Sequence, residues 1–148
     1  MRVVLQRVSA ARVIVGERVV GEIAHGWLAL VGMAPSDTTK ELTWMAEKIA
    51  SLRCFPDPEG KMNRSVQDVG GAVLAVSNFT LYASCSKGRR PSFIEAARPE
   101  MAEPLYLEFL NQLRALGLPV EAGLFGADMR VELSNDGPVT LVIDTETA

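Results

Sequence analysis

A short apolar segment that is followed at once by polar residues constrains this chain most. Residues 73–76 read Val-Leu-Ala-Val, which is typical of a strand buried on both faces of a sheet. Ser77, Asn78 and Thr80 then place three hydrogen-bonding side chains where that strand ends. Such groups either cap and turn the chain or line a site, because polar groups beside a buried strand need partners. The segment predicts a buried central strand whose end is a candidate functional site.

Length and composition indicate one globular domain over residues 1–148. The chain is 48% apolar and 22% charged, which suits a protein with a sizeable core and excludes a disordered one. Charged residues interrupt its start and no apolar run could span a bilayer, so we expect a cytoplasmic protein without a membrane partner. Cys54 and Cys85 lie far apart in sequence and are expected to be reduced, buried thiols.

Hydrophobic periodicity predicts the elements that precede the central strand. Val- and Ile-rich runs indicate strands over residues 2–11, 12–15, 19–24 and 27–33, with a turn at 15–18. Thr38 and Glu41 have capping-box spacing, and apolar residues at helical spacing follow them, so a helix is expected over residues 38–52. Residues 55–60 read as a loop or wide turn and residues 61–69 as irregular chain.

A second helix and further strands are expected after the central strand. The helix begins at Pro99 or Pro104 and ends at Gly117, and four apolar residues form its buried stripe: Leu105, Phe109, Leu113 and Leu116. Residues 118–134 carry one or two strands, residues 135–138 turn, and residues 139–144 form a last strand. This order predicts an α+β fold in which a largely antiparallel, barrel-like sheet packs with two main helices.

Several motifs together resemble those of the D-aminoacyl-tRNA deacylase family. The two most specific stretches read Ser-Asn-Phe-Thr at 77–80 and Asn-Asp-Gly-Pro-Val-Thr at 135–140. Further similar segments are distributed over the chain: Gln6–Val8, Gly60–Asn63, Gly88–Phe93 and Phe125–Met129. The family's pattern has Gln where this chain has Asn78, whose side chain is one methylene shorter. That difference affects contacts that need the longer amide's reach, and it leaves contacts of the backbone unaffected.

The resemblance implies an activity and an assembly. Members of the family hydrolyse the ester that joins a D-amino acid to the 3′-terminal adenosine of tRNA, without a cofactor. They form homodimers in which a cis Gly-Pro dipeptide, here Gly137-Pro138, reaches the partner's pocket and acts as a chirality gate. Without the resemblance, residues 135–138 would read as a hairpin turn with a trans bond, because only about 5–6% of X-Pro bonds are cis.

Ester hydrolysis requires an attacking oxygen and hydrogen-bond donors for the negative oxygen of the tetrahedral intermediate. Ser77, Phe79 and Thr80 are the catalytic candidates, and the backbone N–H groups of Phe79 and Thr80 could be those donors. The Thr80 hydroxyl could attack or could position water, and a nucleophilic Thr needs an adjacent base. His25 is the one histidine and reads as a turn residue, so we favour activation of water by the ribose 2′-OH.

Substrate contacts are expected from Asn78, from Gly137 and Pro138, and from Phe125 and Met129, which could also be ordinary core residues. Residues 73–98 hold four Lys or Arg and one Glu. Within them, three cations are candidates for tRNA phosphates, although they could equally form a solvated charged loop: Lys87, Arg89 and Arg90. One histidine and two distant cysteines form no zinc pattern, so no metal is expected.

D and L substrates carry identical groups, so strong discrimination requires a rigid obstacle where the L side chain would point. A gate that acts by collision cannot reject glycine, so activity on glycyl-tRNA is also expected. Two other functions remain open. One is a non-catalytic domain that binds the acceptor end of RNA, and the other is a hydrolase of small free esters that uses Ser77 or Thr80.

Overall fold

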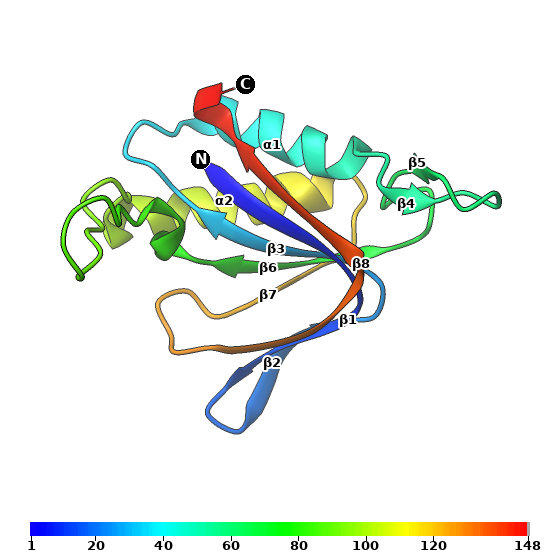
Figure 1. Ribbon diagram of the computed structural model, residues 1–148, viewed down its shortest axis with the longest axis horizontal. Helices are drawn as coiled ribbons and strands as arrows, with labels where there is room; N and C mark the ends of the chain where they lie inside the picture. Colours follow the sequence, from blue (N-terminus) through cyan, green and yellow to red (C-terminus); the bar gives the residue numbers. More distant parts are fainter. Residues whose placement is uncertain (148) are drawn as a thin grey trace.

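The first strand organises the sheet because it pairs along both of its edges. In the computed structural model, which describes residues 1–147, β1 (Arg2–Val15) runs antiparallel to β8 (Arg130–Asp144) along one edge. Its other edge pairs first with β3 (Gly26–Gly32) and further along with β2 (Arg18–Ile23) (Figure 1). The expectation of separate strands over residues 2–11 and 12–15 was wrong, because β1 is one continuous strand that changes its partner along its length.

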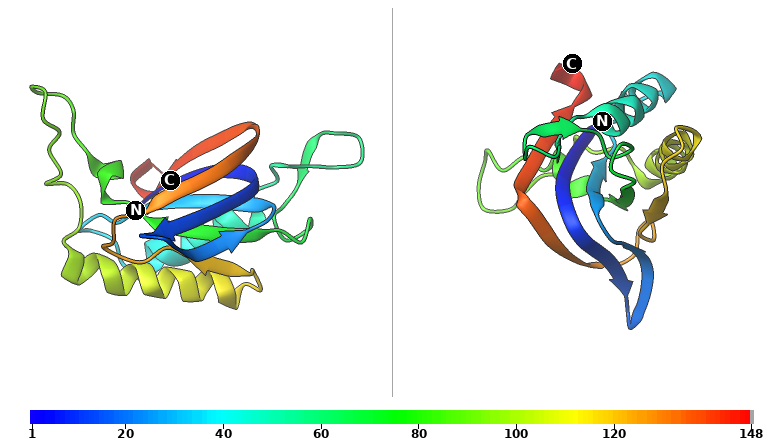
Figure 2. Two further views of the ribbon diagram at one scale, coloured as in Figure 1. Left: turned by 90° about the horizontal axis from the view of Figure 1, so that it is seen from below. Right: turned by 90° about the vertical axis from the view of Figure 1, so that its right-hand side faces the viewer.

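The expectation of a largely antiparallel sheet holds only for the half of the sheet around β1. β6 (Ala72–Ser77) runs parallel to both of its neighbours, β3 and β7 (Val120–Ala122). Parallel neighbours need long crossover connections, which α1 (Thr39–Ser51) and α2 (Pro99–Ala115) provide. Both crossovers lead in the same direction across the sheet, so both helices cover the same face and contact each other (Figure 2).

The sheet curves until its ends almost meet. β2 lies beside β7, and a Cβ added to Gly21 would stand 2.6 Å from the carbonyl oxygen of Ala122. Glycine at position 21 permits this close approach of β2 to β7. The nearly closed sheet and its two helices confirm the prediction of an α+β fold with a barrel-like sheet. A two-stranded hairpin, β4 (Phe55–Pro56) and β5 (Met62–Arg64), projects where a loop and irregular chain were expected.

β6 is buried on both faces, as its sequence predicts. Val73 and Ala75 belong to the core between the sheet and the helices, whereas Leu74 and Val76 belong to the smaller core inside the curved sheet. Alternate residues of a strand point to opposite faces, so one strand contributes to both cores. Packing on both faces therefore holds β6 in place, and with it the position of the residues at its carboxyl end.

The helices follow local signals closely, apart from one buried stripe. Thr38 and Glu41 form the expected capping box at the start of α1. α2 begins at Pro99 and continues through Pro104, and Gly117 beyond its end has a φ of 84°. The buried residues of α2 differ from the expected stripe: they are Ala102, Tyr106, Phe109, Leu110 and Leu113. Leu116 is 37% exposed because the helix ends there.

The segment from Asn135 to Val139 bends β8 without reversing it, so the expected hairpin turn was wrong. Both halves of β8 pair with β1, and the pairing shifts register at this bend. The Asn135 side chain replaces the missing ladder bonds, because its Nδ2 donates to Val139 O and its Oδ1 accepts from Val139 N, each at 3.1 Å. The Gly137-Pro138 peptide bond is cis.

Two short helical turns complete the described chain, η1 (Phe79–Tyr82) after β6 and η2 (Thr145–Thr147) after β8. Within residues 1–147, no helix is long and apolar enough to cross a membrane. The two thiols are free but not both buried, which corrects the expectation. Cys54 is half-buried, and Cys85 is exposed on the loop after η1 because that loop extends away from the sheet.

Candidate functional site

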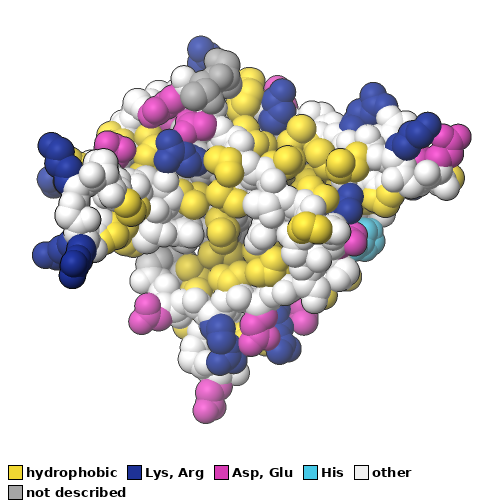
Figure 3. All heavy atoms as spheres, in the orientation of Figure 1, with side chains coloured by type: hydrophobic (Ala, Val, Ile, Leu, Met, Phe, Trp, Pro, Cys, Tyr) yellow, Lys and Arg dark blue, Asp and Glu magenta, His cyan; other side chains and the backbone are white. Residues whose placement is uncertain are grey.

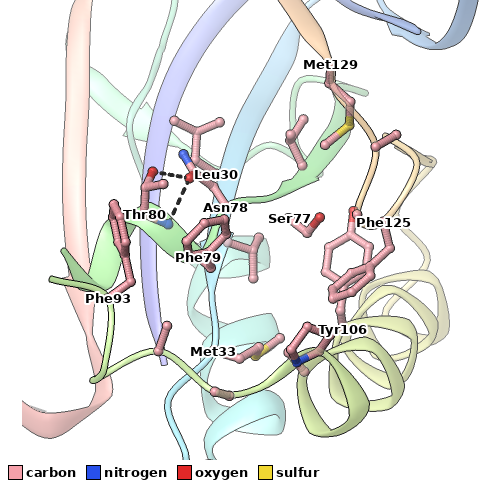
Figure 4. A pocket seen from close by; sticks show the side chains of 18 of the residues that line it. Leu30, Met33, Ser77, Asn78, Phe79, Thr80, Phe93, Tyr106, Phe125 and Met129 are labelled. Carbon is pink, nitrogen blue, oxygen red and sulfur yellow. Dashed lines mark hydrogen bonds between the residues drawn. The ribbon is translucent and has the colours of Figure 1, made fainter. Parts of the chain in front are cut away.

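A cavity opens where β3 and β6 end side by side. Val31 pairs with Ser77 at the last rung of these parallel strands, and Asn78 N still donates to Val31 O at 2.8 Å. The cavity has a volume of about 790 Å³, and Figure 4 shows Tyr106 from α2 and Phe125 from the β7–β8 loop on its far side. This volume lies within the range of small-molecule sites, and the walls are mainly apolar.

The structure brings six of the sequence-predicted residues together around this cavity: Ser77, Asn78, Phe79, Thr80, Phe125 and Met129. The first four come from the end of β6 and the start of η1, and the last two come from the loop before β8. Five others do not line it: Lys87, Arg89, Arg90, Gly137 and Pro138. The three cations lie on an outer loop, and the dipeptide is exposed on β8.

The start of η1 leaves two backbone N–H groups without partners in the helix, those of Phe79 and Thr80. Asn78 caps this turn: its Oδ1 accepts from Thr80 N at 3.2 Å. Phe79 N has no hydrogen-bond partner among residues 1–147. The sequence suggested both N–H groups as donors to a negative oxygen. Among residues 1–147, the Thr80 N–H group is bonded to Asn78 and the Phe79 N–H group is unpaired.

Among residues 1–147, the hydrogen-bond partner of the Thr80 hydroxyl is an amide and not a base. The Thr80 hydroxyl donates to Asn78 Oδ1, and an amide oxygen does not take up a proton at neutral pH. His25 lies at the other end of β3, about 20 Å away along the strand at roughly 3.3 Å per residue. It is exposed, and its Nε2 lies 2.9 Å from Val69 O in the turn, as the sequence predicted.

Tyr106 is the main functional candidate that the sequence analysis missed. Its hydroxyl donates to Ala75 O at 2.9 Å, which ties α2 to β6 beside the cavity. Burial raises the pKa of Tyr106, so the hydroxyl stays protonated and cannot act as a base at neutral pH. The repeat of buried residues at 102, 106, 109 and 113 could have identified it as a helix residue that faces the sheet.

Four other residues that line the cavity were missed: Leu30, Met33, Phe93 and Arg98. The Phe79 and Phe93 rings make an edge contact, with centroids 5.1 Å apart, although their side chains are 57% and 39% exposed. Asp128 is the one carboxylate residue among the described residues that line the cavity, and it is exposed. The lining of the cavity is thus mainly apolar and includes the charged residues Arg98 and Asp128.

The loop from Ser84 to Ala97 carries the basic residues away from the body of the molecule. Lys87, Arg89 and Arg90 are all exposed. Figure 3 shows Lys and Arg side chains on this side of the molecule, where Figure 1 draws the loop, and apolar side chains over the middle of the same face. Phe93 joins the base of the loop to the cavity, so a long ligand could contact both.

Comparisons with known proteins agree over nearly the whole chain. The family model described as D-Tyr-tRNA(Tyr) deacylase matches residues 4–144. A relative from Symbiobacterium thermophilum named D-aminoacyl-tRNA deacylase is 59% identical over 146 residues, which cover 99% of this chain and 97% of the relative. One of the same name from Thermus aquaticus is 57% identical over 145 residues, which cover 98% and 95% of the two chains.

Two solved structures have the same fold. One described as c-Myc DNA unwinding element binding protein has a TM-score of 0.92 and 42% identity, and the match covers 98% of this chain and 99% of the other. One described as a probable eukaryotic D-amino acid tRNA deacylase has a TM-score of 0.81 at 18% identity, which covers 96% and 97% and shows the fold alone. The full-length family match and these relatives establish that the chain belongs to the D-Tyr-tRNA(Tyr) deacylase family.

Proposed function

We propose that this protein hydrolyses the ester bond of D-aminoacyl-tRNA and releases the free D-amino acid and tRNA. The observation that carries the proposal is the cavity at the end of β6, which the Ser-Asn-Phe-Thr motif lines in a chain whose close relatives bear the name D-aminoacyl-tRNA deacylase. The apolar walls suit an amino-acid side chain and the terminal adenosine, with Phe125 and Met129 as contacts. The reaction needs no cofactor and takes place in the cytoplasm.

The chemistry uses a backbone donor and a base from the substrate. Phe79 N–H stabilises the negative oxygen of the tetrahedral intermediate, and one such donor contributes a factor of about 10²–10³ to the rate. The Thr80 hydroxyl bonds to the Asn78 amide and to no basic side chain among residues 1–147, so it does not attack the ester. The ribose 2′-OH next to the ester accepts a proton from the attacking water and passes its own proton to the 3′-oxygen, whose bond to the carbonyl carbon breaks. Ser77 lies beside the reacting atoms at the end of β6.

Selection of the D form occurs in a homodimer. Gly137-Pro138 of one subunit enters the other subunit's cavity and occupies the space that an L side chain would need. Two features support this proposal: Gly137 and Pro138 are exposed and do not line the cavity at the end of β6 in their own chain, and the outer edge of β8 pairs with no strand among residues 1–147. An unpaired long edge strand is a surface that proteins commonly cover.

A filter of this kind accepts glycine. Glycine has no side chain to collide with the dipeptide, so glycyl-tRNA mischarged on non-cognate tRNA is a second substrate. Discrimination against L substrates comes from exclusion and not from side-chain recognition, so a broad range of D-amino acids is accepted. The tRNA itself is held by Lys87, Arg89 and Arg90 through phosphates near the acceptor end.

One observation favours a second candidate function. The solved relative at 42% identity is described as a DNA unwinding element binding protein, so a non-catalytic domain that binds the acceptor end of RNA deserves a test. A time course of deacylation with D-Tyr-tRNA and L-Tyr-tRNA separates the two. The proposed function predicts loss of the D ester alone, whereas a binding domain would leave both esters intact.

The role of the RNA can be tested in the same assay. The protein is expected to cleave D-Tyr-tRNA and to leave the ethyl ester of D-tyrosine uncleaved, whereas a hydrolase of small esters would cleave both. Replacing the terminal adenosine with its 2′-deoxy form should abolish most of the activity. Thr80→Ala should still deacylate D-Tyr-tRNA in a single turnover, to within about fivefold of the wild type, because Thr80 is not the nucleophile. Isolation of an acyl-Thr80 adduct would exclude the substrate-assisted reaction.

A further inference from the structure

We propose that Asn78 is a positioning residue that sets the direction of the Thr80 hydroxyl proton. With that proton directed at Asn78, Thr80 can only accept hydrogen bonds from molecules in the cavity. Figure 4 shows the two bonds from Thr80, one from its backbone N–H and one from its hydroxyl, that end on Asn78. The proposal rests on the proposed function, because it assigns Asn78 a role in that same reaction.

The identity of the bonded Asn78 atom follows from chemistry. A backbone N–H can only donate, so the side-chain atom 3.2 Å from Thr80 N must be the amide oxygen. The Thr80 hydroxyl contacts the same oxygen, which can only accept. The single hydroxyl proton is therefore committed to Asn78, and the two lone pairs of Thr80 Oγ1 remain for other partners.

This arrangement divides donor and acceptor roles between neighbouring residues. Thr80 is exposed and lines the cavity, so its lone pairs can accept a hydrogen bond from a water molecule. Phe79 N–H has no partner among residues 1–147 and can donate to a negative oxygen. A water molecule bonded to Thr80 directs one proton at it and keeps a lone pair for the ester carbon. Without Asn78, the hydroxyl could instead donate to that water and withdraw the lone pair.

The length of the side chain at position 78 matters for this role. Asn, Asp and Ser are the favoured residues before the first helical turn because their short side chains reach the backbone two residues ahead. Asn78 does this from a half-buried position between β6 and η1. The direction of the Thr80 proton thus depends on the short side chain at position 78.

A double-mutant cycle tests the inference with single-turnover deacylation of D-Tyr-tRNA. Asn78→Ser keeps a cap that accepts from Thr80 N–H, but a serine hydroxyl both donates and accepts and so leaves the Thr80 proton undirected. In the wild-type background, Thr80→Val is expected to lower the rate constant by about fivefold at saturating tRNA, with KM unchanged. In the Asn78→Ser background the same change should cost less than about twofold. An equal cost in both backgrounds would overturn the proposal.

Amide hydrogen exchange supplies a readout that does not depend on activity. Thr80 N–H should be protected in the wild type and should exchange at least about tenfold faster in Asn78→Ala, whereas the amides of β6 should keep their protection. An unprotected Thr80 amide in the wild type would contradict the cap and the proposal with it. If the wild type has the protected amide but does not deacylate D-Tyr-tRNA, the proposed function fails, although the Asn78 bond stands.

Discussion

Arg7 holds the bend of β8 through the backbone, because its Nε donates to the carbonyl oxygen of Asp136 at 2.8 Å. Its Nη1 donates to Cys54 O at 2.6 Å, so one guanidinium joins the bend to the chain before β4. The Arg7 side chain is 11% exposed, and the Asp136 carboxylate lies 3.5 Å from its Nε. The position of Gly137-Pro138 therefore depends on a largely buried cation from β1.

Arg7→Lys should weaken both the fold and the selection of the D form. A lysine ammonium cannot reproduce the fork that reaches two carbonyl oxygens, so urea unfolding should show a stability lower by about 1–3 kcal/mol. Deacylation of L-Tyr-tRNA should rise relative to D-Tyr-tRNA. Arg12→Lys is the matched control, because Arg12 joins the same two strands through an exposed pair with Glu132 at 2.7 Å. Equal effects of the two changes would contradict this role of Arg7.

Gly137→Ala should displace the bend. A Cβ on Gly137 would stand 2.3 Å from Val139 N, which is a backbone atom that cannot move without the strand. We expect the ratio of D-Tyr-tRNA to L-Tyr-tRNA deacylation to fall at least about tenfold. Gly16→Ala is the control, since nothing lies within 4 Å of its added Cβ and its φ of 61° makes an alanine there cost about 1–2 kcal/mol of stability without displacing the backbone. An unchanged ratio in Gly137→Ala would argue against the gate.

The basic loop should govern how binding responds to salt. Removing Lys87, Arg89 and Arg90 together should raise KM for D-Tyr-tRNA. It should also reduce the slope of log affinity against log salt by about one for each phosphate that the loop no longer binds. The rate constant at saturating tRNA should stay unchanged. Lys61→Ala is the control, because Lys61 is an exposed cation on the β4–β5 hairpin, which projects from the opposite end of the molecule (Figure 2). A slope unchanged by the triple substitution would show that the loop does not bind phosphates.

Asp144→Asn should destabilise the protein in a manner that depends on pH. Burial alone would raise the pKa of Asp144, but hydrogen bonds from Glu146 N–H and Arg2 outweigh it and hold the pKa below its ordinary value. The stabilisation is therefore fully present above the unfolded pKa of about 3.9 and disappears as pH falls through the lower folded pKa. The variant should be about 1 kcal/mol less stable at pH 7, and the difference should vanish in acid. A difference that is constant with pH would contradict this account.

Local patterns in the sequence predicted much of this fold. The capping box at Thr38, the stop at Gly117 and the two-faced burial of residues 73–76 depend on neighbouring residues, and the structure has all three. Features that depend on distant partners were not visible. The parallel pairing of β6 results from the paths of two helices, and the bend of β8 results from pairing with β1 on both of its sides.

The candidate site was predictable to a similar extent. The polar residues expected at the end of the buried strand do line a cavity there, because a strand's direction fixes where its end lies, and their roles in the reaction stay predictions. The partners of those residues could not be inferred from spacing. Thr80 N–H is taken by Asn78, and Tyr106 reaches Ala75 from a helix that begins more than twenty residues later. Both contacts exist only once the chain has folded.

The most direct test compares three substrates at one enzyme concentration: D-Tyr-tRNA, glycyl-tRNA and L-Tyr-tRNA. If backbone atoms exclude the L side chain, the first two should be deacylated and the third should persist at enzyme levels that clear the others. Cleavage of the L ester at a comparable rate, or survival of glycyl-tRNA where D-Tyr-tRNA is consumed, would contradict selection by exclusion.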